Sequence, residues 1–122
     1  MRIRGGLLGH WAVWTRKAVE ILARVRKQAD SAAGIDPELL THATRVTDAN
    51  AALFDAANHF HGCIAGIHEI LRRQGLLEGR WCLNPSEDLS AGQMEEIDRV
   101  CALYPHLRDD EFVAANLDRW LR

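Results

Sequence analysis

Apolar residues recur at steps of three and four along most of the chain, which is the spacing of one face of an α-helix. In the first run, the recurring residues are Trp11, Trp14, Ala18, Ile21, Leu22 and Val25. The run weakens near residues 31–34, where Gly34 can take the left-handed conformation that ends many helices. The pattern predicts a first helix with its basic residues mostly outside the apolar face.

A second helix is predicted to begin at Asp36-Pro37. Asp36 can accept hydrogen bonds from free backbone N–H groups, and Pro37 at the first helical position has no N–H that needs a partner. The apolar face of this helix comprises Leu39, Ala43, Val46, Leu53 and Ala57, widened by Leu40 and Phe54. We expect it to run to about Asn58.

A third helix is predicted from Gly62 or Cys63 to Gly75, a residue suited to ending a helix after two arginines. Its expected buried residues are Ile64, Ile67, Ile70 and Leu71. An irregular linker over residues 76–89 should follow, because it contains Gly79 and Pro85. We expect the linker to be pinned to the core by its large apolar residues, which are Leu76, Leu77, Trp81 and Leu83.

Two more helices are predicted near the C-terminus. Ser90 and Gln93 have the spacing of a capping box, and Pro105 should end the helix that they begin. The apolar face of this helix would be Met94, Ile97, Cys101 and Tyr104. Asp109 is expected to cap the last helix, whose apolar side is Phe112, Val113, Leu117, Trp120 and Leu121.

No segment has the regular alternation of a confident strand, and "RIRGGLLG" at residues 2–9 is only a weak candidate. The pattern therefore predicts an all-α fold of four or five helices. With 122 residues, of which 48% are hydrophobic, the chain has the size and composition of one globular domain.

Charge and cysteine content narrow the function classes. The net charge is -2, so no excess of positive charge calls for nucleic acid or an anionic membrane, and neither is expected as a partner. No apolar run reaches the roughly 18 residues of a membrane span, and the short apolar start lacks a signal-peptide cleavage site. The three cysteines form no CxxC pair, which favours free thiols in the cytoplasm.

The stretch "HFHGCIAGIH", residues 59–68, is the densest group of candidate ligands. His59, His61 and Cys63 could bind zinc or copper through imidazole and thiolate. However, their two-residue spacing straddles a helix start and matches no zinc signature, and His68 points away from Cys63. Polar caps and half-buried packing are the favoured interpretation, so no metal ligand is assigned.

Other chemistry is weakly indicated. The glycine-flanked "GGLLGH" ending at His10 could bind an anion through backbone N–H groups, although no phosphate-binding glycine motif follows. Lys17 and Lys27 lie on the charged side of the first helix, where a solvated ammonium is a poor nucleophile. No set of nucleophile, base and orienting residue stands out. The sequence therefore assigns no catalytic residue and no cofactor.

The stretches "GGLLGHWAVWTRKAVEIL", "VTDANAALFDAANHFHGCIAGIHEILRRQGLLEG" and "SAGQMEEIDRVCALYPHL" together resemble the C-terminal part of the dihydrodipicolinate synthase and N-acetylneuraminate lyase family. The order of the segments carries this resemblance, since none is a specific motif. Members of the family are pyruvate-dependent class I aldolases built on a TIM barrel with extra C-terminal helices. The resemblance implies that residues 1–34 correspond to the end of the last barrel strand, its loop and the last barrel helix. Residues 35–122 would be the helical appendage, folding with them as one unit.

The family's Schiff-base lysine and its helper residues lie upstream of anything in this chain. A complete barrel takes roughly 250 residues, about twice the length present. The resemblance therefore implies a truncated product, a split piece or a fragment that lacks the aldol activity of the family.

Without a barrel, Trp11, Trp14 and Ile21 would form an exposed apolar patch. We expect self-association or binding of the missing barrel half through them, unless the tryptophans fold back on the later helices. Two alternatives remain: a stand-alone helical interaction module, and a small metal-binding protein using the candidate ligands of the 59–68 stretch.

Overall fold

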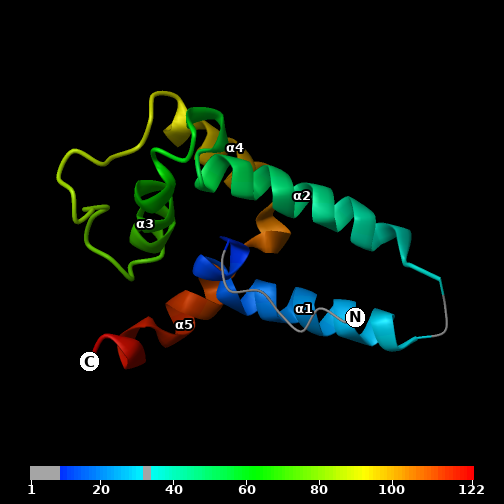
Figure 1. Ribbon diagram of the computed structural model, residues 1–122. Coiled ribbons are helices and arrows are strands. Elements are labelled where there is room, and N and C mark those ends of the chain that lie inside the picture. The colour runs from blue at the N-terminus through cyan, green and yellow to red at the C-terminus, as the bar shows by residue number, and fades with distance from the viewer. Residues whose placement is uncertain (1–8, 32–33) are drawn as a thin grey trace.

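The computed structural model describes residues 9–31 and 34–122. All the regular secondary structure in this part of the chain is helical (Figure 1). The α-helices are α1 (Thr15–Asp30), α2 (Pro37–Leu53), α3 (Cys63–Arg73), α4 (Gln93–Leu103) and α5 (Asp110–Trp120). Short 3-10 helices are η1 (Gly9–Ala12), η2 (Ala56–Asn58) and η3 (Pro105–Leu107). The described residues contain no strand, so the predicted all-α class with four or five helices is confirmed. None of the described helices combines the length and the apolar character needed to cross a membrane. The weak strand candidate lies almost entirely outside the described residues.

The predicted start of the second helix is confirmed. The Asp36 side chain accepts the Glu38 backbone N–H at 2.9 Å, and Pro37 occupies the first helical position. The predicted end at about Asn58 is wrong, because α2 stops at Leu53. Asp55 takes a left-handed conformation with φ of 57°, which breaks the helical backbone. The chain continues as the separate turn η2.

The core lies where α2 packs along α4, with α3, η3 and the start of α1 closing its ends (Figure 1). Its buried members are Val13, Trp14, Ala49, Ala52, Leu53, Ile70, Ile97, Val100, Cys101 and Leu107. Trp14 is only 2% exposed and therefore packs inside the chain. Trp11 and Ile21 are half-buried.

The remaining helices cover less of this core than the pattern predicts. Within α1, all of which the structure describes, Ala18 is the only buried residue, and Val25 is exposed despite its place on the apolar face. On α3, Ile64 is likewise exposed, whereas Ile70 is buried as predicted. On α5, Val113 is buried but the aromatic residues at positions 112 and 120 remain exposed. Helical periodicity identifies a face, but the face is buried only where another element lies over it.

The linker between α3 and α4 is irregular, as predicted, but of its expected anchors only Leu76 is half-buried, and Leu77 is exposed. Trp81 is 74% exposed and Leu83 is fully exposed. Within the linker, the Arg80 guanidinium donates to both carboxylate oxygens of Asp88. Leu89 packs against the core beyond it.

Candidate functional site

The 59–68 stretch is a tight turn at residues 59–62 followed by the first residues of α3. His59 and Phe60 both have positive φ values, 54° and 65°, so the chain reverses before Gly62 caps the helix. His59 and His61 are exposed, and Cys63 is partly buried. Among the residues that the structure describes, no group of three or more His, Cys, Asp or Glu side chains is arranged to hold a metal ion. The structure therefore does not assemble the candidate ligands His59, His61 and Cys63.

Asp55 organises this turn from inside. Its carboxylate is buried and accepts hydrogen bonds from the Ser90 hydroxyl at 2.5 Å, the Asn58 amide at 2.7 Å and the Gly62 backbone N–H at 2.9 Å. Burial alone would raise the pKa of Asp55, but these donors outweigh it and keep the pKa below its ordinary value. Asp55 is thus an ionised carboxylate that joins the end of α2, the start of α3 and the segment before α4.

Gln93 completes the junction from the other side. Its buried amide nitrogen donates to the carbonyls of Ala52, Leu53 and Gly62, at 3.1 to 3.5 Å. Its side-chain oxygen accepts the Ser90 backbone N–H at 3.1 Å, which is one half of the predicted capping box. The other half is replaced, because the Ser90 hydroxyl donates to Asp55.

Glycine is required where α3 meets this junction. A Cβ at Gly62 would lie 1.9 Å from the Gln93 side-chain oxygen, and a Cβ at Gly66 would lie 2.1 Å from the Leu53 carbonyl oxygen. Both distances are far below any real contact. Gly66 therefore allows α3 to approach the end of α2 at backbone distance, and Gly62 leaves room for the Gln93 side chain.

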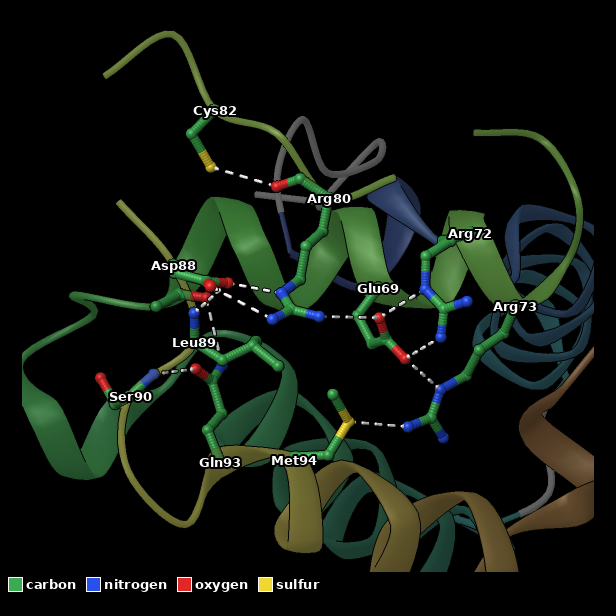
Figure 2. Close-up of polar contacts among 11 residues, drawn as sticks. Glu69, Arg72, Arg73, Arg80, Cys82, Asp88, Leu89, Ser90, Gln93 and Met94 are labelled. Atoms are coloured by element: carbon green, nitrogen blue, oxygen red, sulfur yellow. Dashed lines mark hydrogen bonds and ion pairs between the residues drawn. The ribbon is translucent and has the colours of Figure 1, made fainter. Parts of the chain in front are cut away.

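Figure 2 shows a second polar cluster, centred on Glu69 of α3. The Glu69 side chain is only 1% exposed, yet it carries a charge. Arg72 donates to both of its oxygens, at 2.8 and 2.9 Å, and Arg73 donates to one at 2.8 Å. The hydrogen bonds from Arg72, assisted by Arg73 against the opposing effect of burial, lower the pKa of Glu69 to about 2.

The cluster extends beyond α3 in two directions. Arg80 of the linker approaches Glu69 at 4.0 Å and pairs with Asp88 (Figure 2). Arg73 pairs with Asp98 of α4 at 2.7 Å. Beside it, a pocket of about 520 Å³ is lined by Arg72, Gly79, Arg80, Trp81, Cys82, Pro85, Glu87 and Asp88. The cluster therefore ties α3, the linker and α4 together.

This arrangement supports structure better than catalysis. A general acid or base needs a pKa near the working pH, whereas Glu69 is ionised far below neutrality. Arg72 and Arg80, the arginines that line the adjacent pocket, are both paired with carboxylates of the chain itself. An incoming anion would have to compete with these ion pairs.

The other candidates from the sequence stay apart. Lys17 is half-buried and pairs with Glu20 at 3.0 Å on α1, and Lys27 is exposed near the end of the same helix. His10 lies in η1, where its Nδ1 is 3.3 Å from the Asn50 side-chain oxygen. The glycines and leucines that precede Gly9 in the proposed anion-binding stretch lie outside the described residues. No catalytic set is formed by the candidates that the structure describes.

Neither of the two polar clusters, around Asp55 and around Glu69, contains a sequence motif typical of ligand binding. The pairing of Glu69 with Arg72 and Arg73 follows from their spacing of three and four residues on one helix face. The sequence offers no such signal for Asp55, because its partners come from a turn and from a segment 35 residues away.

Comparisons of the chain with protein-family models, with curated proteins and with solved structures find no match.

Proposed function

We propose that this chain is the C-terminal helical region of a pyruvate-dependent aldolase of the dihydrodipicolinate synthase and N-acetylneuraminate lyase type. In such an enzyme the barrel performs aldol addition or cleavage through a Schiff base, and this region packs beside it. Residues 1–34 would complete the barrel wall, and residues 35–122 would form the appendage. The chain alone would have no lyase activity.

The sparse covering of α1 is the observation that carries this proposal. A helix of 16 residues with one buried residue retains an apolar side that nothing within its own fold covers fully. Val25, on that side, is exposed. A helix from the outer ring of a barrel would have this character, because its apolar side packs against the strands.

The expected contact with a barrel, or with a second copy, can be refined. Trp14 is already buried within the chain, so it is not available to a partner without rearrangement. Trp11 and Ile21, which are half-buried, would make the contact. The three free thiols suit the cytoplasm that we propose as the location.

Two measurements test the assignment. The DNA immediately upstream of Met1 should encode a barrel half, in the same frame or separated by a frameshift. Upstream DNA without such a segment would contradict the proposal. Intact-mass analysis after treatment with pyruvate and borohydride should show no adduct, with a complete aldolase of the family as positive control. A reduced adduct on Lys17 or Lys27 would show that the chain performs the chemistry itself.

A stand-alone interaction module is the second candidate, favoured by the exposure of Trp81 and Leu83 on the linker. Sedimentation of the full chain separates the two proposals. Association that is lost in Trp81→Ala/Leu83→Ala, but kept in Trp11→Ala/Ile21→Ala, would favour the module. The opposite pattern would favour the barrel-facing surface of α1.

A further inference from the structure

Three histidines from three separate elements lie where α1 and η1 approach the rest of the fold. His10 belongs to η1, His42 to α2 and His106 to η3. The ring centroids of His42 and His106 are 5.7 Å apart, and the charges of His10 and His42 would oppose each other. We propose that this histidine cluster is an acid-sensitive latch, which holds η1 and α1 against α2 when neutral and releases them when protonated.

His10 is the buried end of the latch. It is 8% exposed, packs edge-on against the Trp14 ring, and has its Nδ1 on the Asn50 side-chain oxygen. With that oxygen as acceptor, Nδ1 carries the hydrogen and Nε2 carries the lone pair. Nε2 is buried without a hydrogen-bond partner among the described residues. A proton added there would bring a positive charge and an unsatisfied donor into a buried site.

His42, in the part of the cluster next to His106, also has an unsatisfied ring nitrogen. Its Nε2 is also buried and lacks a partner in the part of the chain that the structure describes. It faces His106 across a pocket of about 210 Å³, whose lining also includes Lys17, Glu20 and Arg24. Protonation of His42 would therefore place a cation beside other basic groups.

The carboxylates that could compensate these charges are already engaged. Asp109, which faces His10, accepts from the Arg16 backbone and from Gln74. Glu38 and Glu20 face His42 from α2 and α1, and both accept from arginine or lysine. The basic groups Arg24 and Arg45 oppose protonation of His42 as well. A new imidazolium thus meets no free acceptor among the described groups around it.

The direction of the effect follows from these surroundings. Burial is the main cause that lowers the pKa of both His10 and His42 below the ordinary value of 6.5. The closed state therefore binds fewer protons than the open state. Its stability is complete above about pH 6.5 and falls as the pH drops toward the lowered values. Opening should be most complete in α1, where Ala18 is the only buried residue, and it must also withdraw Val13 and Trp14, which lie between η1 and α1, from the core that α2 and α4 share.

Amide hydrogen exchange of the full chain, corrected for intrinsic rates, tests the latch about one pH unit above and below the ordinary histidine pKa. We expect the protection of α1 amides to fall about tenfold or more in acid, while α4 keeps its protection. In His42→Gln/His106→Gln, the loss of α1 protection in acid should be no more than about half as large, measured as the logarithm of the protection factor. The exposed pair His59→Gln/His61→Gln is the matched control and should behave like the unmodified chain.

Constant protection of α1, or a parallel loss in α4, would overturn the inference. Equal losses in the two double variants would do the same. If the His42→Gln/His106→Gln chain does not fold, ring-proton titration of the unmodified chain decides: the α1 amide shifts must follow the midpoints of His10 and His42. Midpoints set by other groups would refute the latch. This inference does not depend on the aldolase proposal.

Discussion

The carboxylate of Asp109 caps α1 from the far end of the chain, because its Oδ2 accepts the Arg16 backbone N–H at 2.9 Å. Trp14, which precedes α1, has a left-handed backbone and no side-chain cap of its own. The second oxygen of Asp109 accepts from the Gln74 amide at 2.8 Å. One buried side chain thus joins the start of α1, the end of α3 and the start of α5.

Asp109→Ala should destabilise the chain by about 1–2 kcal/mol, since it removes a helix cap and leaves the Arg16 N–H without its acceptor. Urea unfolding followed by circular dichroism would measure the free energy of unfolding. Asp118→Ala is the control, because that side chain is 91% exposed, and its effect should stay within about 0.5 kcal/mol. Equal effects of the two substitutions would show that the cap contributes nothing.

The buried Glu69 should make the chain sensitive to strong acid. Its pKa is lowered from 4.5 to about 2 by Arg72 and Arg73, so its stabilising contribution is complete above about pH 4.5 and is lost as the pH falls toward 2. The shift corresponds to about 1–3 kcal/mol after allowance for the exposure of the arginines. Unfolding free energies measured across this range should show the loss.

Glu69→Gln should remove the loss of unfolding free energy that occurs between about pH 4.5 and 2. The variant should also be less stable than the unmodified chain near neutral pH. Glu95→Gln, on the exposed side of α4, should leave both properties unchanged. An acid profile that is the same in Glu69→Gln and the unmodified chain would assign the dependence to other carboxylates.

Gly66→Ala should destabilise the junction of α2, α3 and α4 by about 1–3 kcal/mol through overpacking, because the new methyl group meets the Leu53 carbonyl oxygen. Gly34→Ala is the matched control, since a Cβ at Gly34 meets nothing within 4 Å. Thermal melting of both variants gives the comparison. A Gly66→Ala chain that melts with Gly34→Ala would mean that α3 can move away at no cost.

Trp14→Ala should cost about 3–5 kcal/mol, the usual range for a large side chain removed from a core. Trp81→Ala, which removes an exposed ring, should change the unfolding free energy by about 0.5 kcal/mol or less. Chemical denaturation measures both values. The comparison also separates the tryptophan that holds the fold from the one that is free to meet a partner.

Local signals in the sequence predicted where helices begin better than they predicted which residues the helices contact. Asp36-Pro37 marks the start of α2 because the cap and the proline act within one turn. Asp109 also has the sequence of a cap, but its oxygens turn to Arg16 and Gln74, and no side-chain cap forms on α5. A cap with competing long-range donors cannot be assigned from its neighbours alone.

The same distinction applies to the candidate site. The histidines of the 59–68 stretch were conspicuous as ligands, yet in the structure residues 59–62 form a turn around Asp55 and the rest of the stretch lies in α3. The end of α2 was missed because its apolar pattern continues to Ala57, while the backbone reverses at Asp55. The Asp55 carboxylate at that reversal accepts from Ser90, which lies beyond the reach of any local pattern.

The Gln93 amide has a consequence for the order of events on the ribosome. The carbonyls that it closes, at Ala52 and Leu53, emerge about 40 residues before their donor. The first two helices therefore leave the exit tunnel without the partner against which α2 is buried. We expect the nascent chain to acquire its tertiary structure late, after α4 has been synthesised, and to depend until then on protection from aggregation.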